Sequence, residues 1–242
     1  MHGNPETDAV WGPLVQALSQ RGTHDIVLLS APGFGAPAAP DWDPTPASYV
    51  AWLAAELDAI DGPIDLVGHD WGAGHVFGLL AEHGDKVRSW AADCAGLLHP
   101  DYVWHDMAQV WQTPGAGEEA VAAMVATPIE DRAAGFSGLG LPEDVAASMA
   151  AGFTEDMGRC ILGLYRAAAQ PALTQLGQRL VATDLPPGLI IDATADAYVS
   201  SDLGVQMLEP LGAGHLKLEG NGHWWMTEAP DAAADGLVSF WS

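Results

Sequence analysis

Residues 67–73 read Val-Gly-His-Asp-Trp-Gly-Ala, and this stretch decides the fold of the chain. It follows an apolar run at 64–67 and precedes a helical stretch rich in alanine, glycine and leucine. The pattern is typical of a sharp turn between a strand and a helix, which presents a nucleophile flanked by glycines. Here the central residue is Asp70. A carboxylate forms an ester with a saturated carbon that carries a strained or departing oxygen or halogen, so the stretch predicts a reaction class.

Short strand-like runs alternate with longer amphipathic runs along the rest of the chain. The strand-like runs lie at 25–29, 64–67, 87–92, 188–191 and 215–218, and helical spacing occurs at 48–60, 71–81 and 231–240. This alternation predicts an α/β fold, with a mostly parallel sheet and helices on both faces.

A long interruption separates the third and fourth of these sheet runs. Residues 97–187 contain helical segments and no convincing strand. We therefore expect an inserted helical cap over 97–187 and a core made of 1–96 and 188–242. Aromatic residues of the cap are candidates for lining an apolar substrate chamber; they are Trp104, Trp111, Phe136 and Phe153.

The composition limits the partners of the protein. Eight Lys+Arg against 32 Asp+Glu give a formal charge of -24, which repels nucleic acid and anionic membranes and favours a small, neutral, apolar substrate. Cys94 and Cys160 are too few for a disulfide framework and lack metal-ligand spacing. The sequence has no secretory leader pattern and no run of 18 apolar residues. We expect a cytoplasmic protein without a metal or cofactor.

Hydrolysis of an aspartyl ester needs a base that activates water. His223, in Asn221-Gly222-His223-Trp224-Trp225, follows the last strand and precedes the last helix, which is where such a base would lie. His69 is next to Asp70 in the chain, but neighbouring side chains at this turn point in opposite directions. We therefore expect His69 to serve packing.

The base needs a carboxylate that orients its ring and stabilises the imidazolium. Asp196 follows the strand at 188–191 and is the preferred candidate, with Asp192 and Asp93 as alternatives. The oxyanion of the hydrolytic step needs N–H donors. We expect the backbone N–H of Trp71 and that of Asn4, in the turn His2-Gly3-Asn4-Pro5, to supply them.

Together these motifs resemble the aspartate-nucleophile branch of the α/β-hydrolase superfamily, which contains epoxide hydrolases and haloalkane dehalogenases. The likeness rests on the turn at 2–5, the elbow at 68–72, the region of Asp196 and Gly222-His223-Trp224. It implies Asp70 as nucleophile, Asp196 as acid, His223 as base and Asn4 in the oxyanion turn. Both reactions of this branch pass through an alkyl-enzyme ester.

In the family that the chain resembles, epoxide hydrolases and haloalkane dehalogenases differ in the residues that stabilise the leaving atom. In epoxide hydrolases two cap tyrosines donate to the oxygen. The segment 158–166 is similar to the stretch that holds the second of them, which implies this role for Tyr165. Met107 stands where the first is expected, and Tyr102 or His105 would have to substitute.

A halide is instead held by the N–H groups of the tryptophan after the nucleophile and of the asparagine in the oxyanion turn, which correspond to Trp71 and Asn4. The sequence favours an epoxide hydrolase that yields a diol. A haloalkane dehalogenase that releases halide and alcohol is the alternative, and a catalytically silent binding protein is a third.

One feature departs from the family. The resemblance implies strands before the His-Gly turn, and here only Met1 precedes His2. We therefore expect the amino-terminal strands to be missing, which would leave hydrogen-bonding strand edges exposed and the core open. Our hypothesis is that the natural protein starts further upstream or that this chain is truncated.

Overall fold

A four-stranded parallel sheet forms the centre of the protein. The computed structural model describes residues 1–22 and 25–242. The strands are β1 (Asp65–Gly68), β2 (Ser89–Ala92), β3 (Gly188–Ala193) and β4 (Gly214–Leu218), and they lie side by side in this order. The register pairs Val67 with Ala91, Ala92 with Ile190 and Ile191 with Leu216. Four of the five predicted strands are therefore confirmed.

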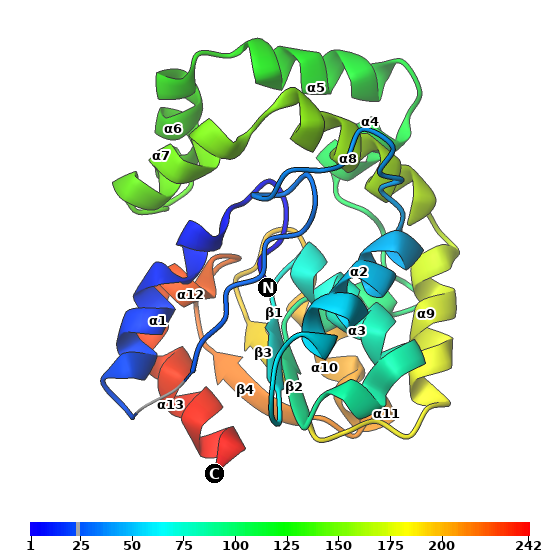
Figure 1. Ribbon diagram of the computed structural model, residues 1–242, viewed down its shortest axis with the longest axis vertical. Coiled ribbons are helices and arrows are strands. Elements are labelled where there is room, and N and C mark those ends of the chain that lie inside the picture. Colours follow the sequence, from blue (N-terminus) through cyan, green and yellow to red (C-terminus); the bar gives the residue numbers. More distant parts are fainter. Residues whose placement is uncertain (23–24) are drawn as a thin grey trace.

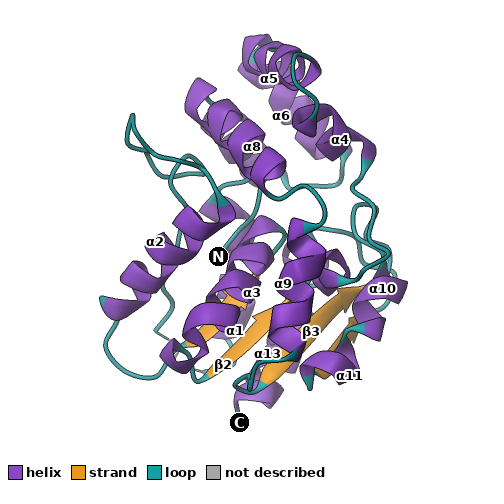
Figure 2. Ribbon diagram, turned by 90° about the vertical axis from the view of Figure 1, so that its right-hand side faces the viewer, coloured by secondary structure: helices purple, strands orange, loops and turns teal. Residues whose placement is uncertain are grey.

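Helices cover both faces of the sheet (Figures 1 and 2). Successive strand residues point to opposite faces, so Ala91 and Ile191 belong to one apolar cluster and Trp90 and Ile190 to the other. The first cluster is closed by η1 (Asp8–Trp11), α1 (Gly12–Ser19), α12 (Trp225–Glu228) and α13 (Pro230–Trp241). The second is closed by α2 (Pro46–Asp58), α3 (Trp71–His83), α10 (Ser201–Gln206) and α11 (Leu208–Leu211). A short turn, η2 (Gly84–Lys86), joins α3 to β2.

The segment between β2 and β3 contains helices joined by loops and no strand. It contains η3 (Ala95–Leu98), α4 (Asp106–Gln112), α5 (Ala116–Ala126), α6 (Ile129–Gly138), α7 (Glu143–Gly152), α8 (Glu155–Ala167) and α9 (Ala172–Val181). Helices α4 to α8 form a layer over the carboxyl ends of the strands (Figure 1), whereas α9 packs beside α3. None of the helices in the described ranges is long and apolar enough for a membrane span.

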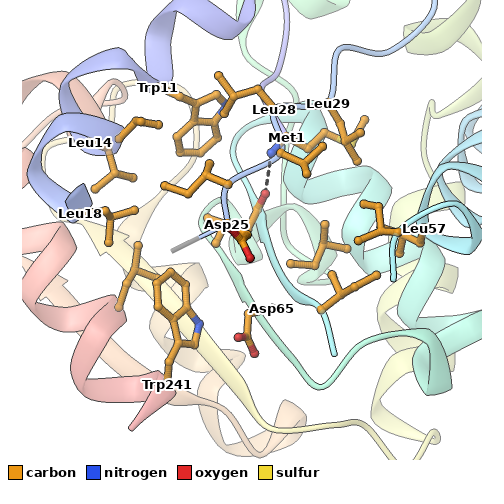
Figure 3. Close-up of a pocket in the computed structure, with 18 of the residues that line it drawn as sticks. Met1, Trp11, Leu14, Leu18, Asp25, Leu28, Leu29, Leu57, Asp65 and Trp241 are labelled. Atoms are coloured by element: carbon orange, nitrogen blue, oxygen red, sulfur yellow. Dashed lines mark hydrogen bonds between the residues drawn. The ribbon is translucent and has the colours of Figure 1, made fainter. Parts of the chain in front are cut away.

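The prediction of a strand at 25–29 is wrong. This segment has no strand pairing and forms one wall of an open groove, and residues 63–67, at the outer edge of β1, form the opposite wall (Figure 3). Met1 pairs with this edge: its amino group donates to the Val67 carbonyl (2.7 Å) and its carbonyl accepts from the His69 N–H (3.0 Å). Without a neighbouring strand to complete a ladder, the apolar side chains remain exposed; Val27 is 57% exposed.

The turn between β1 and α3 has the strained backbone that the sequence predicts for the elbow. Asp70 has φ 51° and ψ −120°, a conformation that side-chain-bearing residues rarely adopt. Gly72 follows it, and a Cβ there would lie 2.3 Å from the Met1 carbonyl oxygen. The first turn of α3 therefore packs directly against the amino-terminal backbone, and this contact fixes where the turn at 2–5 lies.

The substitution Gly72→Ala tests this close approach. We expect it to lower the free energy of unfolding by about 2 kcal/mol, because the added methyl group must displace backbone. Urea denaturation measures the change.

The matched control is Gly135→Ala, within α6, where a Cβ would meet nothing within 4 Å. Alanine is the better helix former, so this variant should gain up to about 1 kcal/mol. Equal stabilities for the two variants would show that the backbone at 1–2 does not constrain the elbow.

Candidate active site

The structure brings the predicted nucleophile and the oxyanion turn into direct contact. The Asn4 backbone N–H donates to Asp70 Oδ1 at 2.8 Å. This approach requires the glycine before it, because a Cβ on Gly3 would lie 2.2 Å from the same oxygen. Trp71 begins α3 beside the carboxylate, and its backbone N–H stays a prediction as the second donor. Burial raises the pKa of Asp70 to about 6, although the charge of His223 opposes the shift.

The predicted base and acid also meet. His223, in the turn after β4, lies with Nδ1 2.8 Å from Asp196 Oδ2 and with Nε2 3.8 Å from Asp70 Oδ2. Asp196 Oδ1 accepts the N–H groups of Tyr198 (2.7 Å) and Val199 (3.1 Å), which fixes the carboxylate. Burial lowers the pKa of His223, but the Asp196 carboxylate outweighs this effect and raises it above its usual value. The three side chains thus form a connected row.

The two alternative acids lie elsewhere. Asp192 accepts from Ser201 Oγ at 2.6 Å and lies 2.9 Å from His215 Nε2, so its carboxylate is engaged away from His223. Asp93 accepts the Asp70 backbone N–H at 2.9 Å and contacts His69. Of the three candidates, Asp196 is the one hydrogen bonded to His223.

The expectation that His69 serves only packing is wrong. Its ring is fully buried, with Nδ1 on Asp93 Oδ2 and Nε2 3.0 Å from Glu6 Oε1. Glu6 also accepts the Gly3 N–H (2.8 Å) and the Trp224 indole N–H (2.7 Å). The sequence analysis missed Glu6. Glu6 directly follows the oxyanion turn at 2–5, but nothing in the neighbouring sequence indicates that its carboxylate is buried and paired.

The group formed by His69, Asp93 and Glu6 is ionised. Burial lowers the pKa of His69, but the carboxylates of Asp93 and Glu6 outweigh it and hold the pKa well above its usual value. Burial likewise raises the pKa of Glu6, but the charge of His69 outweighs it and lowers the pKa to about 2. A buried imidazolium between two carboxylates therefore lies behind the catalytic row, with its ring centroid 4.6 Å from that of His223.

Among residues 1–22 and 25–242, two groups of side chains have metal-ligand atoms within 4.8 Å of one another. They are Glu6 with His69 and His223, and Cys94 with Asp196 and His223. The carboxylates and rings in both groups are already hydrogen bonded within the protein. The expected absence of a metal stays a prediction.

A small cavity lies over Asp70, and its accessible volume of about 10 Å³ is room for about one water molecule. It is lined by Asp70, Trp71, Leu97, Tyr102, Trp104, His105, Tyr165, Tyr198 and Val199. The lining comes from the elbow, the loop before α4, helix α8 and the loop after β3.

Tyr165, on α8, faces the elbow as predicted. Its hydroxyl oxygen accepts the Asn4 side-chain N–H at 3.3 Å, and the Trp71 side chain also hydrogen bonds to it. Burial and the nearby Asp70 charge raise the pKa of this phenol well above its usual value. The hydroxyl therefore keeps its proton beside the nucleophile.

Of the other cap residues that the sequence analysis singled out, some line the cavity and some do not. Trp104 lines the cavity, and its ring stacks on Trp71 with centroids 5.8 Å apart. Trp111 packs against the Tyr165 ring (4.8 Å) and does not line the cavity, so a direct contact with substrate is not supported. Phe136 and Phe153 also lie outside the lining. Met107 is 45% exposed, whereas both proposed substitutes, Tyr102 and His105, line the cavity.

Comparisons with known proteins agree with this fold. A model of the alpha/beta hydrolase family matches residues 1–235, and the chain therefore belongs to that family. Similar solved structures include a loop variant of the haloalkane dehalogenase DbeA from Bradyrhizobium elkanii, with 20% identity over 99% of this chain and 88% of that chain and a TM-score of 0.70.

A hydrolase from Pseudomonas aeruginosa matches with 20% identity over 100% of this chain and 88% of that chain, at a TM-score of 0.75. A thioesterase domain from the curacin biosynthetic pathway matches with 17% identity over 98% and 89%, at a TM-score of 0.72. At these identities the likeness shows the fold alone. No curated protein matches the chain in sequence.

The buried ion group yields a stability prediction. Glu6→Gln should lower the free energy of unfolding by about 3 kcal/mol, because His69 loses one of its two charged partners in a buried site. An amide also offers a single acceptor oxygen where Glu6 uses two. Denaturant unfolding measures the loss.

The control is Glu119→Gln, the same change at an exposed position of α5, which should alter stability by less than about 0.5 kcal/mol. If both variants lose equally little, Glu6 does not hold the site together.

Proposed function

We propose that the protein is an epoxide hydrolase that works through an ester on Asp70 and yields a diol. The observation that carries the proposal is the position of the Tyr165 hydroxyl. It keeps its proton, lies at the nucleophile, and accepts from Asn4 Nδ2 at 3.3 Å. An epoxide oxygen leaves as an alkoxide, and a buried phenol beside it is the acid that this leaving group needs.

Asn4 and Trp71 are the two donors that a halide would require, and both are directed at the phenol oxygen. Their hydrogen bonds lower the pKa of Tyr165 against the larger effect of burial, so they ease the transfer of its proton. A halide would have to displace the phenol from these donors. This competition supports an epoxide over a haloalkane.

His105 is the proposed second donor to the epoxide oxygen. Its Nδ1 accepts the Ala108 N–H at 3.3 Å and caps α4, which leaves the proton of the neutral ring on Nε2. Burial lowers the pKa of His105, and this favours the neutral ring. The ring lines the cavity, with its centroid 6.4 Å from that of Tyr165. His105 would thus replace the first cap tyrosine, whose expected position is held by Met107 in this chain.

In the first step, an Asp70 carboxylate oxygen attacks a ring carbon and forms an ester bond. The carbon–oxygen bond of the epoxide breaks, and its electron pair takes the proton of Tyr165. Oδ2 is the attacking oxygen that the geometry favours, because Oδ1 is held by the Asn4 N–H.

In the second step, His223 takes a proton from water, which attacks the ester carbonyl carbon. Esterification removes the Asp70 charge, which is one of the effects that raise the pKa of His223, so the ring becomes free to act as a base. Asp196 stabilises the imidazolium that forms. The oxyanion is held by the N–H of Asn4 and, in this proposal, that of Trp71. Collapse breaks the bond between the carbonyl carbon and the alkyl oxygen, which takes the imidazolium proton of His223 and leaves as the diol. The Asp70 carboxyl group then loses the proton that the water brought, and the Tyr165 phenolate regains a proton from solvent.

The remaining parts of the proposal follow from the same layout. Residues 97–187 are the cap, and 1–96 with 188–242 are the core. Both cysteines are free and buried, which suits a reducing, cytoplasmic compartment. A haloalkane dehalogenase stays the second candidate, because Asn4 and Trp71 lie together at the nucleophile. The connected row of Asp70, His223 and Asp196 argues against a silent binding protein.

His223→Gln tests the two-step scheme. Without the base the ester cannot be hydrolysed, so the peptide that contains Asp70 should gain the mass of the epoxide after incubation with styrene oxide. Mass spectrometry of the digested protein detects it, and Asp70→Ala is the negative control. An unmodified peptide in His223→Gln would rule out the covalent route.

Tyr165→Phe tests the choice of substrate. Loss of the proton donor should slow the opening of styrene oxide by about 100-fold or more. Release of bromide from a bromoalkane, if the protein catalyses it, should fall much less, since a halide needs no proton. Diol and bromide are measured side by side in both proteins. An unchanged epoxide rate in the variant would remove Tyr165 from the mechanism.

A further inference from the structure

Two donors of the cavity remain unused after the proposed reaction has been accounted for. The Tyr102 hydroxyl and the Trp104 indole N–H both belong to residues that line the cavity. Tyr102 is 5% exposed and Trp104 is 7% exposed. Within 1–22 and 25–242, neither polar atom has a hydrogen-bond partner.

Such groups are costly to leave without a partner. Burying a donor that makes no hydrogen bond typically costs about 1–3 kcal/mol, and folded proteins carry few of them. The two rings contact each other edge to face, with centroids 5.3 Å apart, so the two side chains lie together in the cavity wall. An acceptor in the cavity would relieve both.

The surroundings limit the charge of that acceptor. The charges of Asp70 and Asp196 both act on the Tyr102 hydroxyl, and burial raises the pKa of this phenol, so it stays protonated. A substrate carboxylate would lie beside these two carboxylates and be repelled. A neutral oxygen, such as that of an ether, alcohol or ketone, accepts a hydrogen bond without this repulsion.

A separate crevice on the surface reaches the same residues. Tyr102, His105 and Tyr198 line both this crevice and the cavity over Asp70, so they form the wall between the two. A substituent that extends from the cavity toward the crevice would pass Tyr102. Tyr102 is therefore placed to contact a group attached to the epoxide ring.

We propose that the substrate is a small, neutral epoxide with an oxygen acceptor next to the ring, as in a glycidyl ether, and that Tyr102 and Trp104 bind this oxygen. The proposal rests on the epoxide hydrolase function and refines the expected apolar substrate. Tyr102 acts here on substrate selection, whereas Tyr165 and His105 act on the oxygen that leaves.

The test compares methyl glycidyl ether with 1,2-epoxypentane, which replaces the ether oxygen by a methylene group. The unaltered protein should prefer the ether by about tenfold in kcat/KM, the usual effect of one good hydrogen bond. Tyr102→Phe should bring the ratio close to one. Trp104→Phe, which removes the indole N–H, should lower it in part and provides a second variant if the first folds poorly.

Tyr198→Phe is the matched control, since it removes a hydroxyl from the same wall and should keep the ratio near ten. A ratio near one in the unaltered protein would overturn the proposal. A ratio that Tyr102→Phe leaves unchanged would also overturn it, because the hydroxyl would then bind water or serve the reaction itself. If neither compound is hydrolysed, the epoxide hydrolase function fails first.

Discussion

The buried imidazolium of His69 is the interaction on which the site depends. Asp93 binds one side of the ring and the backbone N–H of Asp70, so it fixes the elbow. Glu6 binds the other side and the N–H of Gly3, so it fixes the oxyanion turn. Two segments that lie far apart in the sequence are thus held in register by one charged ring. The contact between Asn4 and Asp70 then follows from backbone geometry.

The sequence predicted the elements that carry a local pattern. The alternation of strand-like and helical runs located four strands. The elbow and the side chains of Asp70, His223 and Asp196 could then be located because each of them follows one of these strands. Position relative to β3 did not decide among the candidate acids, since Asp192 and Asp196 both follow the strand core. The hydrogen bond between Asp196 and His223 supplies the missing distinction.

Other features depend on contacts between distant residues. Glu6 has no local signal of burial, because its partners are 63 and 218 positions away. The run at 25–29 has strand composition, but strand formation needs a partner edge, and that information is not in the run itself. The hydrogen-bonding role of His105 at the start of α4 likewise became visible only from the capped helix.

The open groove beside β1 affects how copies of the chain behave together. The outer edge of β1, which no described strand covers, next to an exposed apolar row, is a template for sheet extension between molecules. The formal charge of -24 opposes such encounters through repulsion. Because salt weakens that repulsion over about 10 Å at 0.1 M, ionic strength should control whether the molecules stay apart in concentrated solution.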